Sequence, residues 1–264
     1  MKQFDLKNHK RIYIFNCPID ALTMKETVQI IDMAIKEGKH IHHVVVNAAK
    51  IVKMQEDKDL YNSVVNADII NADGMPIVWA SKLLRNPLPE RVAGIDLMQE
   101  LIKLAYRQGY KIFFFGAREE VVKKVVEKYS KEYSPEIIAG YRNGYYSEKE
   151  EPLIAKQIAE SGANILFVAI SSPKKEKFLY KYKDVLKNVN FIMGVGGSFD
   201  VIAGKVKRAP KWMQRCGLEW FYRLLQEPRR MWKRYLIGNT KFMILFLKEF
   251  LKIKLHKKQK LKSN

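Results

Sequence analysis

The chain has 264 residues, 47% of them hydrophobic, which is enough to bury the core of one large domain without disulfides. Its formal net charge of +20 at pH 7 favours an anionic partner. Its two cysteines, Cys17 and Cys216, lie far apart and no apolar run of signal-peptide length opens the chain, so we exclude a disulfide-rich secreted domain and expect a cytoplasmic protein.

Short apolar runs that are typical of buried strands alternate along the chain with amphipathic helical patterns. The predicted strands are Ile12–Phe15, His43–Val46, Ile69–Ile70, Lys111–Phe115, Ile137–Ile138, Ile165–Val168 and Phe191–Met193. The predicted helices are Thr23–Lys36, Ala48–Val64, Pro76–Leu84, Asp96–Arg107, Glu119–Tyr129, Glu148–Glu160 and Pro173–Leu186. This alternation predicts an α/β fold with a Rossmann-like, mostly parallel sheet flanked by helices.

The last quarter of the chain differs from the rest in its charge. From Lys205 to Asn264 there are 18 lysines and arginines but only three acidic residues, Glu219, Glu227 and Glu249. We therefore predict two parts, an α/β body over residues 1–200 and a basic, helical C-terminal appendage over residues 201–264.

Apolar and mostly aromatic residues are interleaved with basic ones in this appendage, namely Trp212, Trp220, Phe221, Tyr222, Leu224, Leu225 and Trp232 with Arg215, Arg223, Arg229, Arg230, Lys233 and Arg234. The mixture is typical of helices that lie in a membrane interface. A buried aromatic core with a solvated basic face is the alternative, and an arm for single-stranded nucleic acid lacks an accompanying motif. The apolar run 242–247 is far shorter than the roughly 20 residues that cross a bilayer, so we expect the appendage to lie on a membrane without spanning it.

Polar residues follow several predicted strands, at the edge of the sheet where open α/β folds bind ligands. Asn47 follows one strand, and Asp73 follows another in the segment NADGMP. Asp73 either caps the next helix or acts as a general base that takes a proton from a hydroxyl. Arg91, in a proline-rich loop, either forms an ion pair with Glu90 or Asp96 or binds phosphate through its planar guanidinium.

Glycines and a lysine follow the remaining strands. Gly116 precedes a helix start, which presents backbone N–H groups to an anion, but the segment lacks the other glycines of a dinucleotide fingerprint. Lys175 lies in a first helical turn, where a cation opposes the helix dipole, so it is a candidate ligand for phosphate or carboxylate. Gly196 and Gly197, in the segment GVGG, allow either a tight turn or a ligand that touches the backbone.

Several segments resemble motifs of the WecG/TagA/CpsF family of bacterial glycosyltransferases, glycosyltransferase family 26. These are NADGMP, PLPERVAG, SPKKEK and GVGGSFDVIAGKVKRAP with the GLEW that follows it, and the resemblance runs from about Ile14 to Leu247. It implies an inverting, metal-independent transfer of N-acetylmannosamine or a related hexose from a UDP-sugar to an undecaprenyl-diphosphate-linked sugar. The implied products belong to teichoic acid, capsule or exopolysaccharide, and the implied location is the inner face of the cell membrane.

The resemblance also implies roles for single residues. Asp73 matches the catalytic base, Asn47 a residue of the sugar pocket, and Arg91 an arginine that handles diphosphate. Further substrate-binding candidates are Gly116, Lys175, Gly196 and Gly197, and the basic positions that match the membrane-targeting appendage are Arg223, Arg230 and Lys233. The implied partners are a UDP-sugar donor, a polyprenyl-diphosphate-linked acceptor and an anionic membrane surface, with no cofactor and no nucleic acid. The sequence does not decide between a monomer and a homo-oligomer.

Two positions depart from the pattern of the teichoic-acid members. Val45 stands where a threonine near the sugar pocket is expected, and Lys175 stands where glutamine is expected. Because Val45 cannot donate a hydrogen bond and Lys175 adds a charge, a uronic acid or another hexose is the alternative donor.

Other kinds of chemistry have little support in the sequence. Asp57 and Asp59 have the DxD spacing by which many glycosyltransferases hold a metal, but they lie in a helical, lysine-rich stretch. No set of His, Cys and Asp residues has the spacing of a zinc site. A nicotinamide-dependent oxidoreductase would need the dinucleotide fingerprint that is missing here. We therefore expect no metal site.

Overall fold

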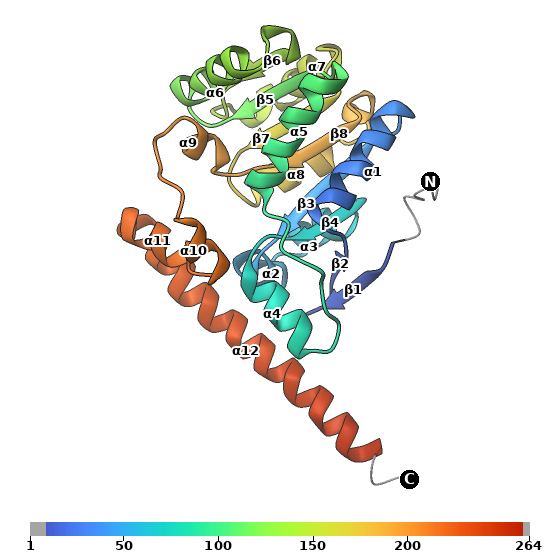
Figure 1. The fold of residues 1–264 in the computed structure, drawn as a ribbon, viewed down its shortest axis with the longest axis vertical. Coiled ribbons are helices and arrows are strands. Elements are labelled where there is room, and N and C mark those ends of the chain that lie inside the picture. Colours follow the sequence, from blue (N-terminus) through green and yellow to red (C-terminus); the bar gives the residue numbers. More distant parts are fainter. Residues whose placement is uncertain (1–8, 261–264) are drawn as a thin grey trace.

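The computed structural model describes residues 9–260, apart from the side chains of Arg230, Arg234 and residues 256–260. At its centre is a six-stranded sheet in the order β4-β3-β8-β7-β5-β6, and every pair of neighbouring strands is parallel (Figure 1). The strands are β3 (Ile41–Val46), β4 (Ile69–Ala72), β5 (Ile112–Gly116), β6 (Ile138–Arg142), β7 (Ile165–Ala169) and β8 (Phe191–Gly194). The predicted mostly parallel α/β sheet is therefore confirmed.

Helices cover both faces of this sheet, because its strands are apolar on both sides. One face packs against α1 (Met24–Lys36), α5 (Gly94–Gln108), α6 (Glu119–Glu132) and α9 (Ser198–Ile202). The other packs against α2 (Ala48–Met54), α3 (Lys58–Val65), α4 (Met75–Leu83), α7 (Glu151–Glu160) and α8 (Lys174–Lys181). Short 3-10 turns, η1 (Pro135–Ile137), η2 (Glu148–Glu150) and η3 (Leu186–Asn188), complete the body.

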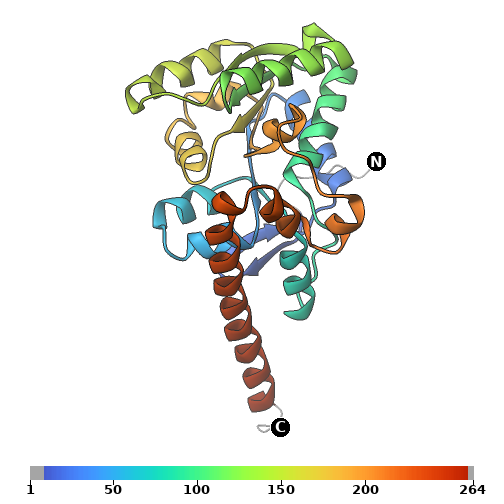
Figure 2. The ribbon, with the colours of Figure 1, turned by 90° about the vertical axis from the view of Figure 1, so that its left-hand side faces the viewer.

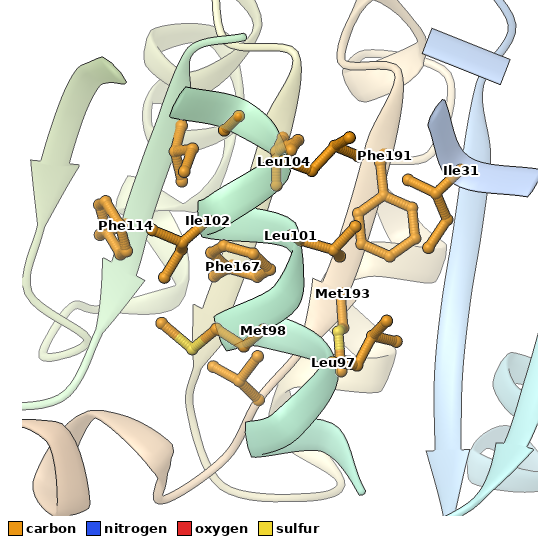
Figure 3. Packing of buried hydrophobic residues seen from close by; sticks show 14 of the residues in the cluster. Ile31, Leu97, Met98, Leu101, Ile102, Leu104, Phe114, Phe167, Phe191 and Met193 are labelled. Carbon is orange, nitrogen blue, oxygen red and sulfur yellow. The ribbon is translucent and has the colours of Figure 1, made fainter. Parts of the chain in front are cut away.

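The core on the α5 face shows how strand alternation divides the side chains. In β5, Phe114 belongs to the cluster under α5, whereas Phe113 and Phe115 point to the opposite face. Figure 3 shows α5 laying Met98 and Ile102 over the sheet, beside Phe114 and Phe167. This packing fixes α5, and with it the loop that enters its first turn, above the carboxyl ends of the strands.

Two predictions about the N-terminal half are wrong in detail. The predicted strand Ile12–Phe15 lies outside the main sheet, because β1 (Arg11–Ile14) pairs antiparallel with β2 (Cys17–Asp20), which was not predicted. Phe15 and Asn16 turn this hairpin with φ of 52° and 60°, as a two-residue turn of this kind requires. The single helix predicted over Ala48–Val64 is divided into α2 and α3, because Asp57 caps α3 by accepting a hydrogen bond from the Leu60 backbone.

The predicted helical appendage is present and consists of α10 (Lys211–Arg215), α11 (Glu219–Gln226) and α12 (Pro228–Lys260). One side of α12 packs on α2 and on the hairpin, where Phe242 meets Phe15 edge to face at a centroid distance of 5.4 Å. Its 33 residues span about 50 Å, and Figures 1 and 2 show its end projecting past the body. No helix among residues 9–260 is long and apolar enough to cross a membrane. The division at residue 200 stays a prediction, and α9 lies across it.

Candidate active site

Asp73 and Asn47 meet at the carboxyl ends of the neighbouring strands β4 and β3. The backbone N–H of Asp73 donates to the carbonyl oxygen of Val46 at 2.7 Å, one residue before Asn47. A Cβ built on Gly74 would lie 3.9 Å from the Cβ of Asn47. Asn47 also caps α2, since its Oδ1 accepts a hydrogen bond from the backbone of Lys50 at 3.0 Å. The structure thus brings two of the predicted site residues together.

Asp73 does not cap the helix that follows it. The residue at the N-cap of α4 is Gly74, with φ of 137° and no side-chain capping bond. The carboxylate instead faces the start of α5, where a Cβ on Gly94 would lie 3.8 Å from its Oδ2 and 3.5 Å from Cγ2 of Val45. The capping role that the sequence left open for Asp73 is therefore wrong for α4, and its role as a general base stays a prediction.

The surroundings of Asp73 change its affinity for a proton. Burial raises its pKa above the ordinary value, and the nearby charge of Glu219 acts in the same direction. The guanidinium of Arg91, the backbone N–H of Gly94 and the ammonium of Lys50 oppose this rise. The net effect is a carboxylate with a raised pKa, as a general base that works near neutral pH requires.

Arg91 belongs to a group of four charged residues, Arg91, Asp96, Arg208 and Glu219, which we call the charge network. Nη1 of Arg91 donates to Glu219 at 3.0 Å, and Nη2 lies 3.8 Å from Asp96. Both Nη groups of Arg208 donate hydrogen bonds to the Asp96 carboxylate, at 2.5 and 2.8 Å. Its Nε lies 3.5 Å from Glu219. Because Arg91 and Asp96 come from the body and Glu219 from α11, the network joins the appendage to the body beside Asp73.

The GVGG segment makes a second contact with the appendage. A Cβ on Gly197 would lie 2.6 Å from Nη2 of Arg223, so this arginine of α11 rests directly on the glycine backbone. Gly196 has φ of 55°, which favours glycine, and no atom lies within 4 Å of a Cβ built there. Gly197 contacts an arginine of the appendage, and the substrate-binding roles of both glycines stay predictions.

The other two basic positions predicted for the appendage lie in α12. Lys233 is exposed, and its ammonium lies 5.5 Å from the ring centroid of Trp232. The side chain of Arg230 lies outside the described part of the chain. Their predicted roles at the membrane or on a lipid diphosphate stay predictions.

Lys175 lies in a buried group of three charges with Lys50 and Glu176, which we call the buried triad. Oε1 of Glu176 lies 2.8 Å from Nζ of Lys50 and 2.9 Å from Nζ of Lys175. Burial acts to raise the pKa of Glu176, but the two lysines prevail and hold it far below its usual range. The Lys175 side chain also crosses Gly194, where a Cβ would lie 2.5 Å from its Cε. The anion that the first-turn lysine needs is thus supplied by the protein itself.

Two histidines lie next to the buried triad and line a small cavity with it. His42 and His43 line, with the buried triad, a cavity of about 10 Å³, which has room for about one water molecule. Burial lowers the pKa of His42 to about 3 and that of His43 to about 4, so both rings are neutral at pH 7. Nε2 of His43 lies 2.8 Å from Oδ1 of Asn71.

The remaining predicted residues have structural explanations. Gly116 has φ of 126°, and a Cβ there would lie 2.5 Å from the backbone of Ala169, so β7 requires the glycine. The substrate-binding roles of Gly116 and Lys175 stay predictions. Asp57 and Asp59 lie 3.6 and 3.1 Å from Nζ of Lys177. Within the described ranges, no group of three His, Cys, Asp or Glu residues could hold a metal.

Both cysteines are free, as the sequence predicted. Cys17 lies in the core under the hairpin, and burial raises the pKa of its thiol to about 12. Cys216 is exposed in the appendage. A thiol as poorly ionised as that of Cys17 is unreactive at neutral pH.

Three residues of this site were not predicted as site residues from the sequence: Gly94, Arg208 and Glu219. The backbone N–H of Gly94 faces the carboxylate of Asp73, while Arg208 and Glu219 connect the appendage to Asp96 and Arg91. A signal for Glu219 was present, because acidic residues are rare in the appendage and this one precedes a tryptophan in a short motif.

Comparison with known proteins adds an independent observation. Residues 12–256 match the glycosyl transferase WecG/TagA/CpsF family. An N-acetylglucosaminyldiphosphoundecaprenol N-acetyl-beta-D-mannosaminyltransferase of Bacillus subtilis (strain 168) is 42% identical over 194 residues, which are 74% of each chain. A protein of the same name from Bacillus spizizenii (strain ATCC 23059 / NRRL B-14472 / W23) is 40% identical over 189 residues, 71% of this chain and 72% of the relative.

Proposed function

The chain belongs to the WecG/TagA/CpsF family of glycosyl transferases, and from this premise we propose that it transfers N-acetylmannosamine from a UDP-sugar to N-acetylglucosaminyl-diphosphoundecaprenol. The names of the two Bacillus relatives support this sugar and this lipid-linked acceptor. The observation that carries the proposal is the position of Asp73, a carboxylate with a raised pKa at the carboxyl ends of two adjacent strands and beside an arginine.

In the proposed reaction, Asp73 removes the proton from the acceptor hydroxyl. The hydroxyl oxygen then forms a bond to the anomeric carbon of the donor sugar, while the bond from that carbon to the UDP oxygen breaks. A single base on the face opposite the leaving group leads to inversion at the anomeric carbon. Asn47, one residue past β3, lines the sugar site in this arrangement.

The departing UDP carries the developing negative charge, and arginines at the site are suited to receive it. Arg91 has a side chain that is only 13% exposed, and Arg223 reaches the end of β8 from α11. A guanidinium binds phosphate oxygens with two parallel hydrogen bonds. This electrostatic interaction is stronger where water is excluded. We assign charge neutralisation to these groups, in a reaction that uses no metal.

The acceptor lies in a membrane, so the appendage is proposed to dock on the anionic inner surface of the cell membrane. Large apolar side chains are exposed along it, namely Trp212, Phe221, Leu225, Trp232, Leu236, Ile237, Met243, Ile244, Leu247, Leu251 and Leu255. Lysines and arginines are interleaved with them. Apolar burial in the interface and attraction to anionic lipids act together in such a surface.

The sequence left two alternative sugar donors open, a uronic acid and another hexose, and the structure favours the hexose. The pairing of Lys175 with Glu176 removes the reason to expect an acidic sugar. Val45 and the Asp73 carboxylate both face Gly94, and the valine side chain offers no hydrogen bond to a donor sugar. This leaves another neutral hexose as the second candidate.

The test is to incubate the full chain with a synthetic prenyl-diphosphate N-acetylglucosamine acceptor and a panel of UDP-sugars, and to identify products by mass spectrometry. We expect UDP-N-acetylmannosamine to be the best donor, with product formation by an Asp73→Asn variant slower by about 10²-fold or more. Preference for a UDP-uronic acid, or no transfer from any UDP-sugar, would contradict the proposal.

A further inference from the structure

Arg91 lies between two carboxylates that matter for the proposed reaction. One is Asp73, on whose pKa the guanidinium acts directly. The other is Glu219 in the first turn of α11, which accepts a hydrogen bond from Nη1 of Arg91 at 3.0 Å. Among the described residues, the ion pairs of Arg91 go to Glu219 and Asp96, and none goes to Asp73. The appendage therefore supplies the carboxylate that holds this arginine.

An arginine that pairs directly with a general base makes it weaker. Such a pair favours the ionised carboxylate and lowers its affinity for the substrate proton. It also occupies the N–H groups that a diphosphate would use. Glu219 limits the first effect by accepting a hydrogen bond from Arg91, so that only the longer-range charge of the guanidinium acts on Asp73. Its own negative charge raises the proton affinity of Asp73.

We infer that Glu219 is a positioning residue for the transfer reaction: it holds Arg91 away from Asp73 and thereby gives Asp73 the basicity that proton removal requires. This inference rests on the proposed function, in which Asp73 is the base. It places on the appendage a group that sets the strength of a base in the body. The base is complete only while α11 lies on the body.

The other groups that face Asp73 do not replace Glu219. Lys50 and the backbone N–H of Gly94 favour the ionised carboxylate, as Arg91 does. The charge of Asp96 is already met by the two-pronged hydrogen bonds from Arg208. Apart from burial itself, Glu219 is the largest influence that raises the pKa of Asp73.

The test compares wild type with Glu219→Gln, which keeps the size of the side chain and an acceptor oxygen but removes the charge. Two quantities are measured in the full chain: the pH dependence of kcat/KM and the titration of the Asp73 carboxyl by ¹³C NMR, assigned with Asp73→Asn. We expect the acid limb of the profile and the Asp73 titration both to move to lower pH. We also expect kcat to fall several-fold without a rise in the KM for the UDP-sugar.

Two further variants act as controls. Glu219→Asp keeps the charge and should restore most of the wild-type profile. Glu56→Gln removes a different ion pair between body and appendage, the one to Lys241 of α12. It should change neither the pH dependence of kcat/KM nor the NMR titration of Asp73.

Some results would overturn the inference. A loss of activity with an unmoved Asp73 titration would make Glu219 a structural contact only, as would a rise in KM with kcat unchanged. The NMR titration does not depend on turnover, so it decides the inference even where the transfer assay fails. A wild-type enzyme that transfers no sugar from the UDP-sugar panel would count against the proposed function instead.

Discussion

The buried triad and the charge network are both made of paired lysine, arginine and carboxylate groups, but they differ in exposure and in the elements they join. The side chains of the buried triad are 2–9% exposed and connect α2 to α8 within the body. Those of the charge network are 13–37% exposed and connect the body to α11. One cluster is sealed inside a single packed unit, and the other bridges two parts of the chain.

This difference in exposure decides what each cluster can do. A charge removed from a dry interior leaves its partner without solvation, so the buried triad is expected to govern stability. A partly exposed pair contributes little to stability, because water solvates the charges that remain when the pair is broken. Such a pair still acts on nearby proton affinities, so the charge network is expected to govern the reaction.

The largest effect is expected for Asp73→Asn, which removes the group on which the charge network acts. We expect kcat to fall by about 10²-fold to 10⁴-fold, since general base catalysis is lost. The raised pKa means that the ionised carboxylate is disfavoured in the folded state. At pH above that pKa the variant should therefore be at least as stable as wild type, with the gain lost below the ordinary carboxyl pKa.

Steady-state kinetics and urea unfolding at several pH values measure these two effects. Near-normal turnover would remove Asp73 from the mechanism. A clear loss of stability at neutral pH would mean that Asp73 belongs with the structural charges.

Glu176→Gln tests the other side of the comparison. It leaves Lys50 and Lys175 without their shared carboxylate, so we expect the free energy of unfolding to fall by about 3–5 kcal/mol in urea titrations at neutral pH. Lys177→Met is a matched control, because it removes an exposed charge from the same helix while its partners Asp57 and Asp59 keep their contact with water, so the stability should stay close to wild type. Equal losses of stability in the two variants would contradict the expectation that buried charges govern stability more than exposed ones do.

Two glycines near the end of β8 offer a sharper test. Gly197 lies against Arg223 of the appendage, and Gly194 lies against Lys175 of the buried triad. In Gly197→Ala the new Cβ displaces Arg223, while the φ of −79° remains allowed for alanine. We expect the transfer rate to fall by roughly 10-fold to 100-fold with little change in melting temperature. In Gly194→Ala the Cβ displaces Lys175, and we expect a loss of stability instead. The reverse pattern would contradict our division of roles.

The smallest effect on stability is expected for Arg208→Gln. Its ion pairs are partly exposed to water, so the free energy of unfolding should change by at most about 1 kcal/mol. The loss should shrink further in high salt, because such pairs are screened. A loss as large as that of Glu176→Gln would show that the charge network is a structural cluster too.

The sequence predicted the sheet and the position of Asp73 at a strand end because their signals are local. Runs such as His43–Val46 and Lys111–Phe115 are apolar on both faces, which is typical of strands in a covered parallel sheet. Asp73 was found because strand ends in such sheets hold ligands. The strand Cys17–Asp20 was missed because it is a short run that contains Pro18, a residue that breaks many strands.

The ion pair of Arg91 with Asp96 was one of the alternatives that the sequence offered. The other pairings could not be predicted, because they depend on packing between distant segments. Arg91 and Glu219 are 128 positions apart, and nothing local to either residue identifies the other as its partner. Lys175 shows the opposite case. A first-turn lysine correctly predicted a nearby anion, but adjacent residues on a helix do not face each other, so Glu176 was not an obvious partner. Burial next to Lys50 brings them together.

The two free cysteines give the native chain a ready-made optical reporter. A maleimide dye should react with Cys216 and leave the buried thiol of Cys17 untouched. The labelled residue precedes Gly217, which lies so close to Trp79 of α4 that a Cβ there would be 2.6 Å from the indole. Since tryptophan quenches many dyes on contact, the emission at this one position would follow the seating of the appendage on the body in real time, without any engineered cysteine.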